Sequence, residues 1–129
     1  MKELAIKKNV TGNMNTVIEQ LIEAIKPAGF GILTRIDFDK KIKEKLNKDM
    51  RPTVILGACN PGLAYDAYQQ ATDVALLIPC NIVVTEKENG EVLIEAMRPS
   101  AMMQFLPEIK ANEKMIEAEK KLELAINSL

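Results

Sequence analysis

The clearest helical pattern of apolar residues lies between Asn13 and Pro27, where they recur every three or four positions. The members of this stripe are Val17, Ile18, Leu21, Ile22 and Ile25. Asn13 can cap the start of the helix, while Thr16 and Glu19 form a competing capping box. Pro27 and Gly29 end it. The pattern therefore predicts one amphipathic helix whose start is either of the two capping positions.

A second helical stripe follows Pro107 and continues to the end of the chain. Its apolar members are Ile109, Met115, Ile116, Ala118, Leu122, Ala125, Ile126 and Leu129. Charged residues fall between them, as in a helix with one face on a core. We therefore expect a single domain over residues 1–129, with a core at about 1–100 and a closing amphipathic helix at about 107–128.

Shorter apolar runs predict strands at 4–8, 30–36, 53–58 and 74–86, and a fifth that starts at 92. The third run does not alternate with polar residues, so both of its faces are expected to be covered. Proline cannot donate to a strand ladder, so Pro79 predicts a bulge or an edge within the longest run. A short basic helix capped by Asp39 and a helix entered at Asn60-Pro61 are expected between the strands.

The clearest turn is Asn89-Gly90, because both residues tolerate the positive φ that a type I′ hairpin requires. A two-residue turn at this point places Thr85 opposite Ile94. The mixed order of helices and strands, with an antiparallel hairpin, indicates an α+β fold. We expect a mostly antiparallel sheet of four to five strands, helices packed on one face, and a long C-terminal helix.

The composition excludes several classes of function but does not identify one. The chain has 129 residues, is 47% hydrophobic and 27% charged, and carries a net charge of −1. Such a charge gives no field that draws nucleic acid or an anionic membrane. No apolar run has the length of a membrane span, and the first residues lack the apolar core of a signal peptide. We therefore expect a cytoplasmic protein with no nucleic-acid and no membrane partner.

Histidine is absent and there are two cysteines. The first fact excludes a histidine general base and a Ser-His-Asp relay. Two cysteines without histidine also make a four-ligand zinc site within one chain improbable. We expect neither a metal nor another cofactor, and in the cytoplasm both thiols are expected to stay reduced.

Both cysteines stand in Cys-Asn dipeptides beside a proline, Cys59-Asn60-Pro61 and Pro79-Cys80-Asn81. Cys59 directly precedes the predicted start of a helix, where free N–H groups and the dipole are expected to lower the pKa of a thiol. We therefore take Cys59 and Cys80 as candidate catalytic residues, a nucleophile and a resolving thiol. The amides of Asn60 and Asn81 are candidate ligand donors. The alternative is that each cysteine only fills space in the core.

Two more residues are candidates for ligand binding. Arg51 precedes the third predicted strand and could pair with an anion, although a surface role is also open. Asp37 ends the second strand and could be an acid or the cap of the following turn.

Three functions remain open at this point. The first is a binding module, a homodimer that holds a small anionic or sulfur-containing ligand near the two Cys-Asn dipeptides. Apolar residues on both faces of a strand motivate the dimer, since a second covering surface is needed. The second is a thiol-dependent sulfur-transfer or redox enzyme with Cys59 as the nucleophile. The third is a structural or regulatory dimer without an active site.

The chain also resembles a known family. The blocks that carry the resemblance are Gly29-Phe30, Ile36-Asp37, Arg51-Pro52, Ile55-Leu56-Gly57-Ala58-Cys59-Asn60-Pro61 and Leu76-Leu77-Ile78-Pro79-Cys80-Asn81-Ile82-Val83-Val84. With them, residues 1 to 100 resemble the domain-of-unknown-function family numbered 302. The resemblance implies a compact α+β domain that forms homodimers and has no established activity, and whose relatives in some cases occur beside sulfur-handling proteins.

Matched by position, the residues that mark this family fall on Arg51, Asp37, Cys59, Asn60, Pro61, Pro79, Cys80 and Asn81. The resemblance thus implies a site at the residues that their chemistry already singles out, without implying a mechanism. Arg98 departs from the pattern, because an acidic residue is expected at that position of the family.

Overall fold

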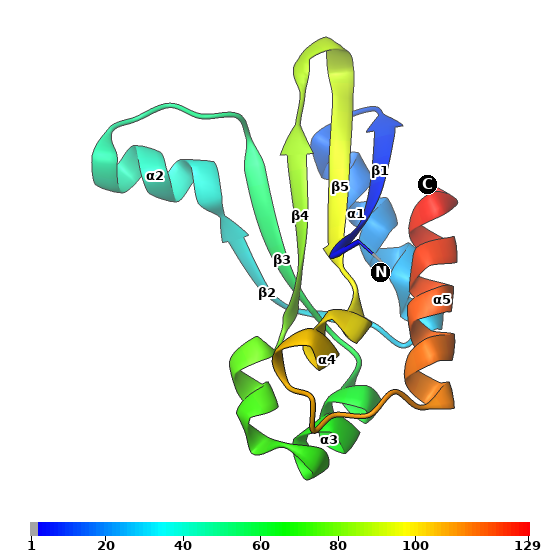
Figure 1. Ribbon diagram of the computed structural model, residues 1–129. Coiled ribbons are helices and arrows are strands. Elements are labelled where there is room, and N and C mark those ends of the chain that lie inside the picture. The colour runs from blue at the N-terminus through cyan, green and yellow to red at the C-terminus, as the bar shows by residue number, and fades with distance from the viewer. Residues whose placement is uncertain (1–2) are drawn as a thin grey trace.

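The computed structural model describes residues 3–129 and contains a five-stranded sheet (Figure 1). Its strands are β1 (Ala5–Thr11), β2 (Gly31–Asp37), β3 (Thr53–Cys59), β4 (Cys80–Glu86) and β5 (Glu91–Met97). They lie in the order β1-β5-β4-β3-β2, and all four neighbouring pairs are antiparallel. The predicted α+β class and antiparallel sheet are confirmed.

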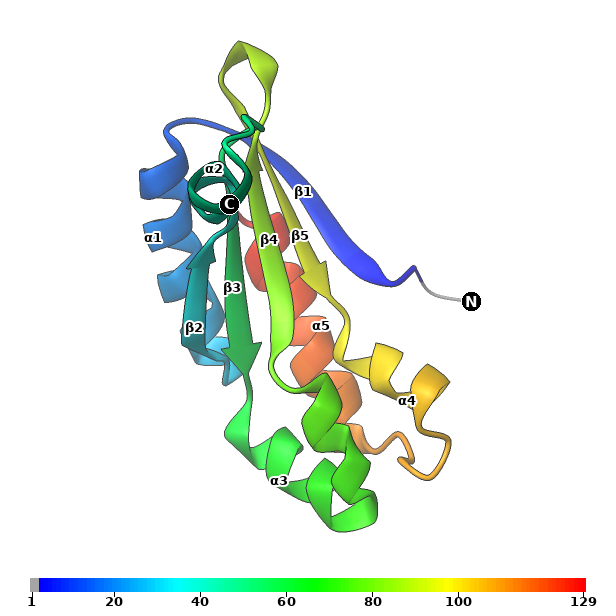
Figure 2. The same ribbon diagram turned by 90° about the vertical axis from the view of Figure 1, so that its left-hand side faces the viewer.

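Helices α1 (Met14–Ile25) and α5 (Glu113–Asn127) cover one face of the sheet (Figures 1 and 2). The remaining α-helices are α2 (Phe38–Leu46), α3 (Pro61–Gln70) and α4 (Met102–Phe105). Short 3-10 helices are η1 (Lys26–Ala28), η2 (Thr72–Leu77), η3 (Glu88–Gly90) and η4 (Pro99–Ala101). Helices α3 and α4 lie together beyond one end of the sheet, whereas α2 projects away from it (Figure 1).

The core lies between the sheet and the pair α1 and α5. In β5, Val92, Ile94 and Ala96 are fully buried while the residues between them are not, because successive strand side chains point to opposite faces. Leu21 of α1 and Ile126 of α5 close the core from the helical side and are also fully buried. One face of the sheet therefore supplies half of a two-layer core.

Local capping chemistry sets where two of these helices begin. Asn13 is the N-cap of α1, and its side chain accepts a hydrogen bond of 3.2 Å from Thr16 N. Asn112 caps α5 in the same way, so that helix begins at Glu113 rather than near residue 107 as predicted. Helix α2 begins after Asp37, not after Asp39, whose carboxylate instead accepts from Thr53 N at 2.9 Å.

The run at 74–86 is not one strand. Residues 72 to 77 form η2, and β4 begins only at Cys80. Pro79 therefore lies before the strand, and the sheet's irregularity falls on β2, between Ile32 and Thr34. The predicted bulge at Pro79 is wrong, since a proline that precedes the ladder needs no bulge.

The hairpin between β4 and β5 exists, but its predicted register is wrong by one residue. Thr85 lies opposite Leu93, not Ile94. The cause is a three-residue connection, Glu88–Gly90, in which Asn89 has φ 65° and Gly90 φ 72°. Both kinds of turn need residues with positive φ, and the Asn-Gly pair can supply them in either one.

The second face of the sheet has no helix of residues 3–129 packed on it (Figure 2). Ile55, Val83 and Leu93 lie on this open face and are half-buried. Helix α2 projects from the same side and has no buried residue. None of the described helices combines the length and apolar character that crossing a bilayer requires.

Candidate functional site

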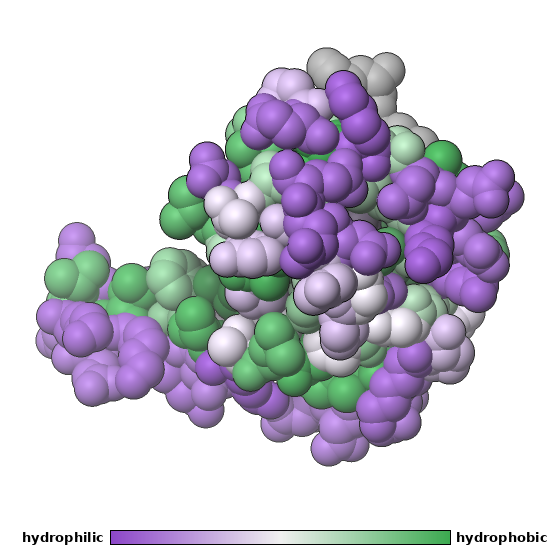
Figure 3. Space-filling view, turned by 90° about the horizontal axis from the view of Figure 1, so that it is seen from below, coloured by the Kyte–Doolittle hydropathy of each residue, from purple (hydrophilic) through white to green (hydrophobic). Residues whose placement is uncertain are grey.

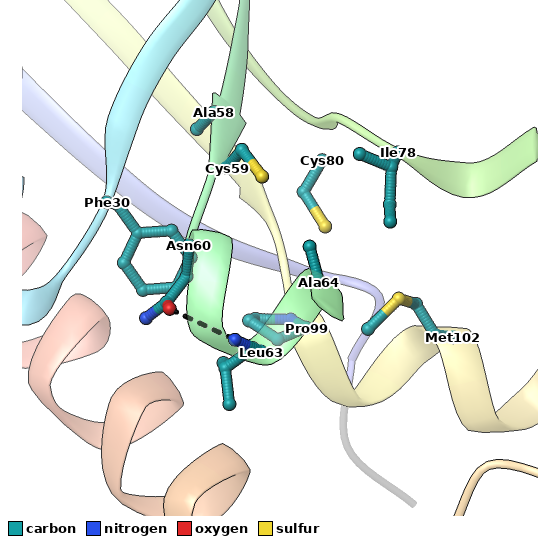
Figure 4. A pocket seen from close by; sticks show the side chains of 10 residues that line it. All are labelled: Phe30, Ala58, Cys59, Asn60, Leu63, Ala64, Ile78, Cys80, Pro99 and Met102. Carbon is teal, nitrogen blue, oxygen red and sulfur yellow. Dashed lines mark hydrogen bonds between the residues drawn. The ribbon is translucent and has the colours of Figure 1, made fainter. Parts of the chain in front are cut away.

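The strand order brings the two cysteines together. Cys59 ends β3 and Cys80 begins β4, and these strands are antiparallel neighbours in which Ala58 lies opposite Cys80. Between them the chain passes through α3 and η2 and then returns to the same end of the sheet. Figure 4 shows both side chains directed toward one pocket.

That pocket is small and mostly apolar. Apart from the two cysteines and Asn60, every residue that lines it is apolar, among them Phe30 and Met102. It offers about 20 Å³ to the centre of a water-sized sphere, which is room for one group of that size. No charged side chain lines it. A bound anion would therefore meet no opposing charge in its wall.

Asn60 belongs to the pocket but already has a structural task. Its side-chain oxygen accepts a hydrogen bond of 3.3 Å from Leu63 N and so caps α3 (Figure 4). Its Nδ2 atom lies close to Gly29, where an added Cβ would come within 2.8 Å of it. Gly29 also has φ 90°, which favours glycine. The amide oxygen is thus held by the cap of α3, and the amide nitrogen occupies the space that a side chain at position 29 would need.

Asn81 does not share this pocket. It follows Cys80 along β4, so its side chain points to the opposite face of the sheet, and it is exposed. Gly57 is its partner on β3. The two Cys-Asn dipeptides therefore place their sulfur atoms together and their amides apart.

Arg51 and Asp37 lie at the other end of the sheet. Asp37 is opposite Val54, near the start of β3, and the seven residues of that strand extend roughly 20 Å to Cys59. The Asp37 carboxylate pairs with Arg35 at 3.1 Å, and Arg51 pairs with Glu88 at 3.3 Å. Neither residue lines the cysteine pocket.

Burial raises the pKa of both thiols. The pKa of Cys59 is raised by desolvation. The pKa of Cys80 is raised to about 11, first by desolvation and then by the nearby charges of Cys59 and Glu119. The lowered pKa expected for Cys59 is therefore wrong. The apolar walls disfavour the thiolate. At the start of α3, the N–H of Leu63 already donates to the side chain of Asn60, so it is not free to stabilise a thiolate.

Sequence reasoning missed two contributors to this region. Met102 brings a third sulfur to the pocket wall from α4 (Figure 4). Glu119 of α5 is buried, and its carboxylate accepts from Ser100 N at 2.8 Å and pairs with Arg98 at 3.7 Å. A helical stripe of apolar residues marks Met115 and Leu122 around it as core, but no pattern links position 119 to position 80.

Among residues 3–129 no group of three or more His, Cys, Asp or Glu side chains is placed to hold a metal ion. The site thus consists of two neutral thiols and a thioether, enclosed by hydrocarbon and one capping amide. Such an arrangement can receive a small, soft, uncharged group, and it gives little help to an ionised nucleophile.

Comparison with known proteins agrees with this fold. A crystal structure of an uncharacterized conserved protein DUF302 from Bacillus stearothermophilus superposes with a TM-score of 0.80. The two sequences are 28% identical, and the match covers 97% of each chain. No curated protein matches. The model of the family described as domain of unknown function DUF302 matches residues 6–129. The chain therefore belongs to the DUF302 family.

Proposed function

We propose that this protein is a binding module that holds a small sulfur-containing ligand between Cys59 and Cys80. The observation that carries the proposal is the convergence of two thiols, from the end of one strand and the start of its neighbour, on a single apolar pocket. Homodimer formation and a cytoplasmic location, where both thiols stay reduced, are parts of the same proposal.

The character of the pocket wall decides between ligand classes. Sulfur is polarizable and accepts close contact with other sulfur atoms and with aromatic edges, both of which Met102 and Phe30 provide. An anion would lose its hydration in an apolar pocket without a cation in return. We therefore favour a neutral sulfur-containing group over the anionic ligand that the sequence left open.

The size of the pocket limits how much of a ligand it encloses. Space for one water-sized group accommodates the terminal sulfur of a thiol, while the rest of the molecule would remain outside. The pocket walls come from β3, β4, α3, η4 and α4 and from the loop residues Phe30 and Ile78, so a larger ligand requires part of this wall to move. A thiol-dependent enzyme is the less supported function, because such an enzyme needs a thiolate and both thiols are neutral at physiological pH.

Native mass spectrometry of gently purified protein tests the proposal directly. We expect each chain of 14.3 kDa, or the dimer of two such chains, to carry an additional bound mass, and we expect the Cys59→Ser/Cys80→Ser variant to lose that mass. Met102→Leu should weaken retention, whereas Met103→Leu serves as the matched control, because Met103 does not line the pocket. A bound mass that survives the double cysteine variant would place the ligand elsewhere.

A soft monovalent metal ion is a second candidate, favoured by one observation. Three sulfur atoms, from Cys59, Cys80 and Met102, line the same pocket, and thiolate with thioether is the ligand set that Cu(I) prefers. Titration with Cu(I) against a chromophoric chelator tests it. Metal binding must displace the thiol protons, so affinity should rise with pH, and Met102→Leu should lower it while Met103→Leu should not.

A further inference from the structure

The segment from Leu33 to Met50, called here the β2–α2 arm, runs from the edge strand β2, which pairs with β3, into α2, which projects from the sheet (Figure 1). Figure 3 shows it projecting from the body with apolar residues along one side and polar residues along the other. Its exposed large apolar residues are Leu33 (62%), Ile36 (45%), Phe38 (37%), Leu46 (61%) and Met50 (41%). So much apolar surface on one projection marks an interaction surface.

Helix α2 has little cover from its own chain, apart from the hydrogen bond that Asp39 accepts from Thr53 N and the half-buried Ile42. It has nine residues and buries none of them. Isolated helices shorter than about 12 to 15 residues are marginal in water. Phe38, Ile42 and Leu46 recur every four positions and so form one apolar stripe along the helix. A stripe of this kind needs a surface to cover it.

The open sheet face offers such a surface. Ile55, Val83 and Leu93 lie on it, half-buried, with no helix of residues 3–129 above them. In Figure 2 α2 lies in front of the strands, on the side opposite α5, and Figure 1 shows it projecting away from them, so that the arm and the face form a corner. Each molecule therefore presents both an apolar helix and an uncovered apolar sheet.

The exposed area has the size that pairing requires. The chain exposes 7822 Å². A compact monomer of 14.3 kDa exposes roughly 6,800 Å². The excess of about 1,000 Å² is comparable to the roughly 800 Å² that each partner contributes to a standard interface.

We infer that the occupant of this corner is a second copy of the chain, with α2 of each copy lying on the open sheet face of the other. A two-fold axis makes both contacts at once, since the helix of one copy meets the sheet of its partner and the reverse. The apolar stripe of α2 and the open sheet face are then both covered in one closed assembly. The inference rests on the homodimer of the proposed function and is independent of the ligand.

Light scattering coupled to size-exclusion chromatography tests the inference. We expect the natural chain to have twice 14.3 kDa at micromolar concentration. Leu46→Glu should raise the dimer dissociation constant at least about 30-fold, because two leucines per dimer lose their apolar cover. The matched control is Leu124→Glu, which changes a leucine of similar exposure, 64% against 61%, on α5. That control should remain dimeric.

A second measurement covers the case in which Leu46→Glu does not fold. The chain has no tryptophan, so Phe38→Trp introduces one tryptophan, on the arm, whose fluorescence can be followed. Its emission should shift to longer wavelength as the protein is diluted to monomer.

These measurements distinguish dimer formation itself from the part that the arm plays in the dimer. A natural chain that is monomeric at micromolar concentration overturns the dimer and the arm together. A dimer that persists in Leu46→Glu, with tryptophan emission unchanged on dilution, leaves a dimer but removes the arm from it. Neither result bears on the ligand, which native mass spectrometry of the cysteine variants tests separately.

Discussion

Arg98 and Glu123 join the end of β5 to the C-terminal helix, because Arg98 Nη2 donates a hydrogen bond of 2.8 Å to Glu123 Oε2. The guanidinium also pairs with Glu119 at 3.7 Å, and the side chains of Arg98 and Glu119 are 12% and 5% exposed. The hydrogen bond to Glu123 is the largest cause that raises the pKa of Arg98. Arg98 therefore forms a buried ionic contact between the sheet and the C-terminal helix.

Arg98→Met is expected to lower the free energy of unfolding by about 2 to 3 kcal/mol, because it removes a cation beside the buried carboxylate of Glu119. Urea unfolding followed by circular dichroism measures the change. Lys7→Met is the control, since the Lys7–Glu95 pair is exposed and 3.9 Å long. It should cost less than about 0.5 kcal/mol. Equal losses would show that the burial of the pair at Arg98 has no energetic consequence.

Alkylation rates of the single cysteine variants should show two protected, neutral thiols. In Cys59→Ser, the remaining Cys80 loses one of the charges that raise its pKa, so its titration midpoint should lie between 9 and about 11. In Cys80→Ser, the remaining Cys59 should still titrate above 9. Iodoacetamide modification measured against pH gives both midpoints. A thiolate that forms below about pH 7.5 would instead support the enzyme reading.

Stability should fall in alkali because of Cys80. The folded state holds the thiol proton up to about pH 11, whereas the unfolded chain releases it near pH 9. Between these values the folded state binds more protons, so the free energy of unfolding declines as pH rises. Urea midpoints measured from pH 8 to 11 should show this decline in the natural protein and a shallower one in Cys80→Ala. Parallel slopes would mean that the thiol is solvated in the folded state.

Gly29→Ala should disturb the cap of α3. The residue has φ 90°, and a Cβ there would lie 2.8 Å from Asn60 Nδ2. Strain of this kind costs about 1 to 3 kcal/mol. Gly31→Ala is the matched control, because nothing lies within 4 Å of its Cβ position. Chemical unfolding compares the two variants, and a loss in Gly31→Ala as large as that in Gly29→Ala contradicts the contact with Asn60.

Features that depend on a few neighbouring residues could be predicted from the sequence. Asn13 was one of two predicted caps, and it is the one that binds Thr16 N. Asn60-Pro61 was the predicted start of α3, and it is the observed one. In the hairpin, however, the same Asn-Gly pair fits turns of two and of three residues, so the local signal could not determine the register.

The candidate site was predictable only in part, for a similar reason. The Cys-Asn dipeptides pointed to positions 59 and 80, and antiparallel pairing of β3 and β4 places these two residues at one end of the sheet. The pKa direction depends on burial by Phe30 and Met102, which are distant in the chain. Helix-end electrostatics is a local effect that sequence reveals, whereas desolvation is a property of the assembled pocket.

The connection between β3 and β4 leaves the sheet after Cys59 and re-enters it at Cys80, and Ala58 and Cys80 are the last residues paired across the two strands. In topological terms residues 60 to 79 are the loop of a single hairpin. A tight turn grafted in their place would keep the strand order while removing α3 and one wall of the pocket. The molecule can thus be divided into a scaffold and an exchangeable cover, so that one wall of the pocket can be varied while the strand order is kept.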